Sequence, residues 1–352
     1  MHFRFITSTP LTIARGSGTY TGITTLAKFL RESGQTVDLI TPGIKLPVYT
    51  AERIVFNERL RFQPADRNAV TVGFDMDGYS LPRAGFTRTG FHIASIKGVI
   101  ADEMRFERGL THATMRIQAH YEKLHVQRAD LVIAPSQYSA ARIQELYGIS
   151  TQPRVVPEPI DLAQWRRLLT ENVSPTEEGK FIVLCVCRFY PRKRLPVLLS
   201  AACRLRARIP GLEVRLVGGG PETARLKAIA REKRLDGSVT WLGNVSQSEL
   251  AREYNRCHVF CMASVQESFG IVFLEAMAAG KPIVASRAAS VPEVVKYGVL
   301  VEPDSDEALA EGIERLYKDP ALRAALVDES RRWVEQFDGP LVAAQFMNVL
   351  GS

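Results

Sequence analysis

The chain has 352 residues, and at roughly 100–200 residues per domain this length suggests about two domains. The 46% hydrophobic and 24% charged residues are ordinary values for a globular protein, and they exclude a disordered chain, a collagen and a small disulfide scaffold. The formal net charge of +7 is spread over both halves of the chain. We therefore expect a mildly basic, solvated surface and no nucleic-acid partner.

The apolar runs and the cysteines of the sequence bear on localisation and on metal binding. No apolar run approaches the roughly 18 residues of a spanning helix, and Met1 to Thr7 lack the basic and apolar stretches of a secretory signal. The five cysteines form no Cys-x-x-Cys pair, and Cys185 and Cys187 lie inside an apolar run. We therefore expect buried thiols, no zinc site and a cytoplasmic protein.

Strands and helices alternate along the first half of the chain. A strand at 3–7, a glycine turn at 16–18, a helix at 19–33 and a strand at 36–40 make one βαβ unit, which predicts a parallel sheet. Further strands are predicted at 70–74, 91–96, 131–135 and 154–157, and helices at 101–128 and 138–147.

The polar, turn-rich segment 171–179 is predicted to be a linker, after which the alternation restarts. Strands are predicted at 181–187, 212–217, 239–242, 258–262 and 282–286, and helices at 195–208, 222–234, 248–256, 271–279, 306–317 and 321–337. Two such halves predict an α/β fold with two doubly wound domains, 1–165 and 166–335, facing across a cleft that holds the active site.

The most informative segment runs from Glu267 to Pro282 and includes a predicted junction of loop and helix at Gly270. The first-turn amides, from Phe269 to Val272, would lack helical partners and would attract an anion or a hydroxyl group. Glu275 could accept hydrogen bonds from a diol such as ribose, and Glu267 from sugar hydroxyls. Taken alone, each of the two glutamates is expected to be an ordinary surface residue. The complete segment is a much more specific indication of a binding site.

On this segment the chain resembles the retaining GT-B glycosyltransferases of family 4 (glycosyl transferases group 1), which carry two glutamates at this spacing before an A-M-A-x-G-x-P sequence. The loop from Arg188 to Lys193 resembles the family's diphosphate-contacting loop. Further similarities lie in the segments 218–222, 239–245, 129–136 and 155–161. The resemblance covers about 125–320 strongly, and it implies a GT-B fold in which 336–352 crosses back to the first domain.

The resemblance implies a retaining hexosyltransferase (EC 2.4) that uses a nucleotide-diphosphate sugar and no cofactor. Arg188 and Lys193 could neutralise the departing diphosphate from one side and the helix terminus from the other, so that no metal ion is needed. The predicted donor-binding residues are Gly16, Gly18, Arg188, Lys193, Gly218, Val245, Glu267, Ser268, Phe269, Gly270, Ile271, Val272 and Glu275.

The acceptor side departs from the family pattern, which often places a histidine at the end of a first-domain strand. Here Asp77 and Lys97 fall in that region, and they join Arg188, Lys193 and Glu267 as predicted catalytic residues. The pair Asp102-Glu103 is a further candidate, and His92 lies nearby within a predicted strand. The spacing of Asp75 and Asp77 could suit a metal, but a turn with exposed carboxylates is the preferred interpretation.

The sequence leaves several alternative functions open. A nucleotide-sugar epimerase or phosphorylase of the same fold would share the donor motifs, and a non-catalytic binder is a third reading. The glycines at 16, 18 and 22 do not match the dinucleotide fingerprint, which disfavours a nicotinamide cofactor. The segment 49–62, with Arg53, Arg59 and Arg61, predicts either a surface helix or contact with the inner face of a membrane. The acceptor could be a carbohydrate, a lipid or a small molecule.

Overall fold

The computed structural model describes residues 1–10, 13–62, 66, 68–81 and 90–351. The chain forms two compact units: unit 1 comprises Met1–Pro159 with Gly339–Ser352, and unit 2 comprises Ile160–Asp338. The divisions therefore lie a few residues from the predicted ones, after 165 and after 335. The segment 171–179 is not the boundary, because helix α6 (Leu162–Glu171) before it belongs to unit 2, with Leu162 and Trp165 buried in that unit's core.

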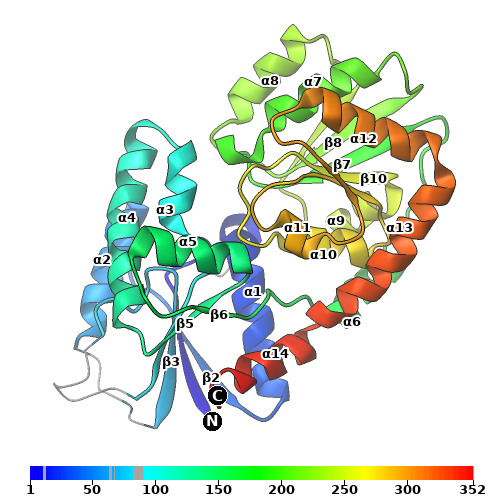
Figure 1. The fold of residues 1–352 in the computed structure, drawn as a ribbon. Helices are drawn as coiled ribbons and strands as arrows, with labels where there is room; N and C mark the ends of the chain where they lie inside the picture. The colour runs from blue at the N-terminus through cyan, green and yellow to red at the C-terminus, as the bar shows by residue number, and fades with distance from the viewer. Residues whose placement is uncertain (11–12, 63–65, 67, 82–89, 352) are drawn as a thin grey trace. The chain divides into compact units, whose positions relative to one another are not determined.

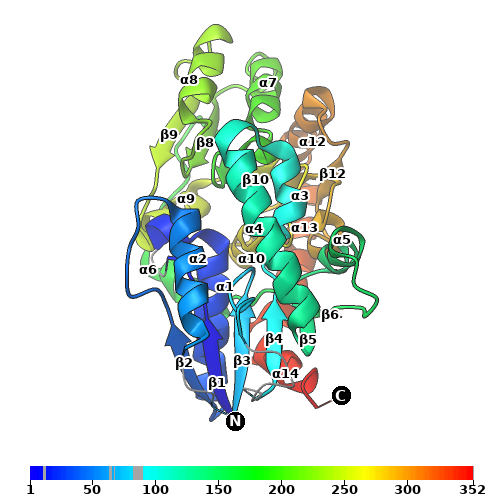
Figure 2. The same ribbon diagram turned by 90° about the vertical axis from the view of Figure 1, so that its left-hand side faces the viewer.

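Unit 1 contains a six-stranded parallel sheet in the order β2-β1-β3-β4-β5-β6. Figure 2 shows β1, β3 and β4 running side by side. The strands are β1 (His2–Ile6), β2 (Thr36–Ile40), β3 (Ala69–Phe74), β4 (His92–Ser95), β5 (Leu131–Ala134) and β6 (Arg154–Val155). The helices are α1 (Ile13–Glu32), α2 (Tyr49–Leu60), α3 (Ile100–Glu103), α4 (Gly109–Arg128), α5 (Gln137–Tyr147) and α14 (Gly339–Asn348).

Alternating side chains along the strands explain why helices cover both faces of this sheet. Phe3 and Phe5 lie in one core cluster with residues of α1 and α14, whereas Ile6 packs against α2. Helix α14 lies beside α1, as the red and blue helices of Figure 1 show, and the rings of Phe346 and Phe3 meet edge to face at 6.0 Å. The C-terminal helix thus completes the core of unit 1.

Two predictions for unit 1 are wrong. Helix α1 already begins at Ile13, so Gly16 and Gly18 lie inside the helix and not in a turn before it. Two glycines do not prevent this, because each costs a helix only about 1 kcal/mol relative to alanine. The helix predicted at 101–128 is divided into α3, a 3₁₀ turn (Met104–Phe106) and α4, because the backbone becomes extended at Glu107 and Arg108.

Unit 2 contains a second six-stranded parallel sheet, in the order β12-β11-β10-β7-β8-β9. The strands are β7 (Phe181–Val186), β8 (Leu212–Val217), β9 (Val239–Gly243), β10 (Val259–Met262), β11 (Ile283–Ser286) and β12 (Val299–Val301). Besides α6, the helices are α7 (Leu195–Leu205), α8 (Thr223–Glu232), α9 (Gln247–Arg256), α10 (Ile271–Ala278), α11 (Val291–Val294), α12 (Asp306–Lys318) and α13 (Pro320–Trp333), with 3₁₀ turns at Pro191–Lys193 and Val334–Phe337.

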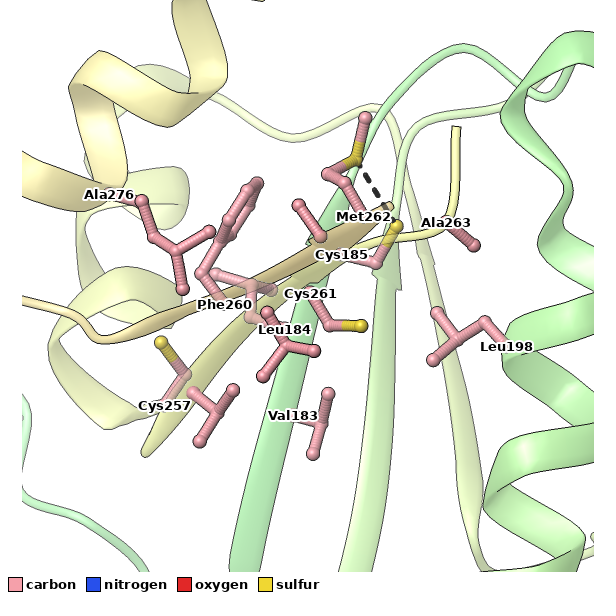
Figure 3. Packing of buried hydrophobic residues seen from close by; sticks show 14 of the residues in the cluster. Val183, Leu184, Cys185, Leu198, Cys257, Phe260, Cys261, Met262, Ala263 and Ala276 are labelled. Atoms are coloured by element: carbon pink, nitrogen blue, oxygen red, sulfur yellow. Dashed lines mark hydrogen bonds between the residues drawn. The ribbon is translucent and has the colours of Figure 1, made fainter. Parts of the chain in front are cut away.

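The core of unit 2 is centred on the adjacent strands β7 and β10. In Figure 3, Leu184 and Phe260 lie among side chains that fill both faces, with Leu198 from α7 on one side and Ala276 from α10 on the other. The strands are apolar on both faces, as parallel strands between two helical layers must be. The five cysteines are free thiols; Cys185, Cys257 and Cys261 are buried as predicted, whereas Cys187 and Cys203 are half-buried.

The predicted doubly wound α/β architecture is confirmed, and it indicates where a ligand would bind in each unit. The order of the strands reverses between β1 and β3 in unit 1, and between β7 and β10 in unit 2. In open α/β sheets, ligands bind outside the carboxyl ends of the strands at this switch point. The loops that follow these four strands are therefore the segments in which to look for a site.

Candidate active site

The loop after β7 carries Arg188 and Lys193, and the backbone of the next loop holds it in place. The Phe189 N–H donates to the Gly219 carbonyl at 3.0 Å. Gly218, which follows β8, has φ +115°, and a Cβ there would lie 2.0 Å from the Cys187 carbonyl oxygen. Gly218 is therefore required for close packing of the two loops. Its predicted contact with a donor, like that of half-buried Arg188, stays a prediction.

The loop after β10 carries Glu267 and is fixed at two points. The Val265 N–H donates to the Arg192 carbonyl at 3.0 Å, which ties this loop to the loop of Lys193. The Ser290 hydroxyl donates to the Glu267 carbonyl at 2.9 Å. The backbone thus brings two charged residues together that lie far apart in the sequence.

Lys193 and Glu267 form an ion pair across the switch point of unit 2. Lys193 Nζ lies 2.6 Å from Glu267 Oε1, and only 12% and 8% of the two side chains are exposed. No residue in the described part of the chain donates a hydrogen bond to Oε2 of Glu267. One oxygen of this carboxylate is therefore held by the cation while the other is left for a ligand.

Helix α10 begins directly after this loop, as the sequence predicted. Gly270 precedes it in the left-handed conformation, with φ +91° and ψ 72°, and a Cβ would lie 2.7 Å from the ring of Phe273. Within the described chain, the amides of Ile271 and Val272 have no acceptor. These amides and the positive end of the helix dipole suit an anion.

Three more of the predicted donor residues in unit 2 differ in their burial. Ser268 and Phe269 are buried, and the ring of Phe269 meets that of Phe337 edge to face at 5.6 Å. The Phe269 side chain therefore belongs to the core, which leaves its backbone as the group that could reach a ligand. Val245 is half-buried in the loop after β9 and packs against the same core.

Glu275 lies one turn into α10 and is half-buried. The Tyr254 hydroxyl donates to its Oε2 at 3.1 Å, and the indole N–H of Trp165 donates to its main-chain carbonyl at 3.0 Å. Burial raises the pKa of Glu275 to about 7, against the hydrogen bond from Tyr254, which lowers it. The carboxyl group therefore changes its charge near neutral pH.

At the switch point of unit 1, Asp77 plays a different part from the one predicted. It is fully buried and accepts hydrogen bonds from Ser8, Arg53 and Asn57, with the Arg53 guanidinium 3.3 Å from Oδ2. A carboxylate with both oxygens engaged in the interior stabilises the unit and offers nothing to a substrate. Arg53 and Asn57 lie four positions apart, one turn of α2, and this spacing in the sequence could have indicated that they share a polar partner.

Lys97 is also engaged, through Glu158. Its Nζ lies 2.9 Å from Glu158 Oε1 and 3.1 Å from Oε2, and the two side chains are 8% and 6% exposed. Lys97 therefore does not present an uncompensated charge for an anionic acceptor. The partner could have been suspected, because Glu158 stands where the resembling family has asparagine in its V-I-P-N-G-V-D segment.

The remaining acceptor-side candidates stabilise the interior of unit 1. His92 Nε2 lies 2.9 Å from His125 Nε2, and burial lowers the pKa of His92 to about 3 and that of His125 to about 4. Asp102 is buried and accepts from the Tyr138 hydroxyl at 2.7 Å and from Arg142 at 3.2 Å. These groups support the fold.

The residues that the structure describes contain neither a metal-binding cluster nor a membrane-spanning helix. No group of three histidine, cysteine, aspartate or glutamate side chains there could hold a metal ion. No helix there has the length and apolar character needed to cross a membrane.

The chain is similar in sequence to known glycosyltransferases. Residues 169–333 match the family model described as Glycosyl transferases group 1. A phosphatidyl-myo-inositol mannosyltransferase from Mycolicibacterium smegmatis is 28% identical over 94% of this chain and 89% of its own. A GDP-mannose-dependent alpha-(1-6)-phosphatidylinositol monomannoside mannosyltransferase from Mycobacterium tuberculosis is 30% identical over 58% of this chain and 57% of its own.

The solved sucrose-phosphate synthase from Thermosynechococcus elongatus superposes with a TM-score of 0.81, at 22% identity over 99% of this chain and 98% of that chain. This likeness confirms the predicted GT-B fold. The matched family model and the relatives confirm the predicted enzyme class, a glycosyltransferase.

Proposed function

Since residues 169–333 have the sequence of a group 1 glycosyltransferase, we propose that the protein transfers a hexosyl group from a nucleoside-diphosphate sugar to a hydroxyl of an inositol phosphate headgroup. GDP-mannose is the donor to test first, and phosphatidylinositol is the first acceptor. The names of the two mannosyltransferase relatives support both choices. The observation that carries the proposal is the Lys193–Glu267 pair beside the start of α10.

The donor diphosphate binds between Lys193 and the unpaired amides of Ile271 and Val272. Phosphate oxygens are strong acceptors, and an ammonium group together with a helix N-terminus stabilises the negative charge that develops as the diphosphate leaves. Arg188, at the end of β7, supplies a second cation on the same loop as Lys193.

Glu267 and Glu275 bind the hydroxyl groups of the donor. Glu267 keeps its contact with Lys193 through Oε1 and accepts a hydrogen bond from the sugar through Oε2. Glu275 lies eight residues after Glu267 in the sequence. It accepts hydrogen bonds from the ribose diol when its carboxyl group is ionised. The hexose and the nucleoside are thereby held on opposite sides of the diphosphate.

The reaction proceeds with retention at the anomeric carbon and without a metal ion. Retention is supported by the resemblance to family 4, whose two spaced glutamates this chain shares. Metal independence is supported by the ammonium group of Lys193 and the helix amides of α10, since such groups can together neutralise a diphosphate.

A lipid acceptor requires contact with a membrane surface, and the segment around α2 supplies suitable groups. Arg53 is buried and takes no part, contrary to the sequence interpretation. The exposed apolar side chains nearby are Ile44, Val48, Tyr49, Val55 and Phe62, and the exposed basic ones are Arg59 and Arg61. Such a combination favours peripheral binding to anionic lipid at the cytoplasmic face.

The proposal is tested with GDP-[14C]mannose, short-chain phosphatidylinositol and excess EDTA. Transfer of label to the lipid, with an α linkage by NMR, is the expected result. No transfer to any polyol acceptor, or a β-linked product, would contradict it. The same assay without acceptor tests the alternative epimerase, which would release an epimeric nucleotide sugar; neither relative's name favours that activity.

A further inference from the structure

Asp75 lies at the switch point of unit 1, directly after β3. Its two carboxylate oxygens differ in their environment. Oδ1 accepts hydrogen bonds from the main-chain N–H groups of Lys97, at 2.8 Å, and Gly98, at 3.2 Å. In the described part of the chain, Oδ2 has no hydrogen-bond partner. Glu267 has the same arrangement in unit 2, with one oxygen held and one left open.

Asp75 is only 8% exposed, yet its Oδ2 is not among the fully buried side-chain atoms that lack a partner. The open oxygen of this otherwise buried side chain is therefore the one that solvent or a ligand can reach. The backbone of Asp75 is also held in the left-handed region, with φ +54°. Residues in such conformations gather at functional sites.

Among the described residues no cation contacts the open oxygen, although the charge of Arg53 lowers the pKa of Asp75. The Arg53 guanidinium is bonded to Asp77, Ser8 and Gln118, and the Lys97 ammonium is paired with Glu158. Burial raises the pKa of Asp75 to about 6, so the group is still ionised at pH 8. An ionised carboxylate oxygen accepts hydrogen bonds and repels a phosphate, so a hydroxyl group is the partner that fits.

We propose that Oδ2 of Asp75 accepts a hydrogen bond from a hydroxyl group of the acceptor and so positions the acceptor for transfer. This inference rests on the proposed function, in which the acceptor is a polyol. Asp75, and not the predicted Asp77, is then the acceptor-binding carboxylate of the Asp75-Met76-Asp77 segment.

The test compares Asp75→Asn with Asp130→Asn. Asparagine tolerates the left-handed backbone and keeps an oxygen for the two amides, so the loop is preserved. Asp130 is the matched control, because its Oδ2 likewise caps a backbone amide of unit 1, that of His92, at 2.9 Å. Each variant is assayed at pH 8 with GDP-mannose as donor and short-chain phosphatidylinositol as acceptor, and its melting temperature is recorded.

For Asp75→Asn we expect the acceptor KM to rise at least ten-fold, with the GDP-mannose dissociation constant and the melting temperature close to wild type. Asp130→Asn should leave the acceptor KM unchanged. An unchanged acceptor KM in a folded Asp75→Asn protein would overturn the inference while the proposed function stands. If the wild-type protein transfers no sugar to any acceptor, the proposed function fails, and the inference fails with it.

Discussion

Lys193 Nζ lies 2.6 Å from Glu267 Oε1, so two residues 74 positions apart form one nearly buried ion pair. The pair joins the loops after β7 and β10, which flank the point where the strand order of unit 2 reverses. If either residue is removed, the charge of the other is nearly buried and unpaired, which is unfavourable unless a ligand pairs with it. A nucleoside diphosphate sugar carries a partner for each residue, namely phosphate groups for Lys193 and hydroxyl groups for Glu267.

Glu267→Gln should lower the rate of sugar transfer by about 10²–10³-fold, because the amide replaces the carboxylate that accepts from the hexose. The matched control is Glu311→Gln, an exposed glutamate on α12 of the same unit. Turnover is measured with saturating GDP-mannose. A Glu267→Gln enzyme with wild-type turnover would remove this residue from the sugar site.

The affinity for GDP-mannose should increase with pH through the pKa of about 7 that burial gives Glu275. Below that pH the carboxyl group is protonated and accepts hydrogen bonds from ribose poorly, so the dissociation constant should fall about ten-fold between pH 6 and pH 8. GDP-mannose suits this measurement because its diphosphate keeps its charge over this range.

Glu275→Gln is the control for that titration, because glutamine cannot change its charge. Its dissociation constant for GDP-mannose should be independent of pH between 6 and 8. The assignment of Glu275 to the ribose would be wrong if the wild type and Glu275→Gln showed the same pH profile.

Gly270→Ala should reduce the free energy of unfolding by about 1–3 kcal/mol, because alanine is strained at φ +91° and its Cβ would meet the Phe273 ring. Gly43→Ala is the control, since a Cβ there meets nothing within 4 Å and no positive φ is involved. It should change stability by less than about 0.5 kcal/mol. Equal stabilities of the two variants in urea would show that the α10 start is not constrained in this way.

Asp77→Asn should cost about 3–5 kcal/mol of stability, because it leaves the buried Arg53 guanidinium without its counter-ion. Binding of GDP-mannose by the folded variant should equal that of wild type. A variant with normal stability but impaired transfer would restore Asp77 to the catalytic role that the sequence suggested.

The loop and helix around Gly270 could be predicted from the sequence because their signals are local. The residues around Gly270 specify a loop, a glycine and an apolar helix in succession, and the structure starts α10 at Ile271. The direct contact of Lys193 with Glu267 could not be predicted, because it depends on the backbone bond between Val265 and Arg192.

The environments of the charged residues that follow β3 and β4 were predicted less well because their contacts are tertiary. Asp75 and Asp77 look equivalent in the sequence, and the left-handed backbone at Asp75 helps to set them apart. Asp77 meets Arg53 and Asn57 of α2 in the interior, while Asp75 keeps an open oxygen. Lys97 finds its partner Glu158 61 residues away, which no local pattern reveals.

The most direct test is the calorimetric titration of GDP, in EDTA, into the wild type, Lys193→Ala and Glu267→Gln. If a diphosphate rests against Lys193 beside the start of α10, Lys193→Ala binds GDP at least ten-fold more weakly than wild type. Glu267→Gln binds GDP as tightly as wild type or more tightly, because its lysine has lost a neutralising partner. Equal affinity of Lys193→Ala and wild type for GDP would contradict the account.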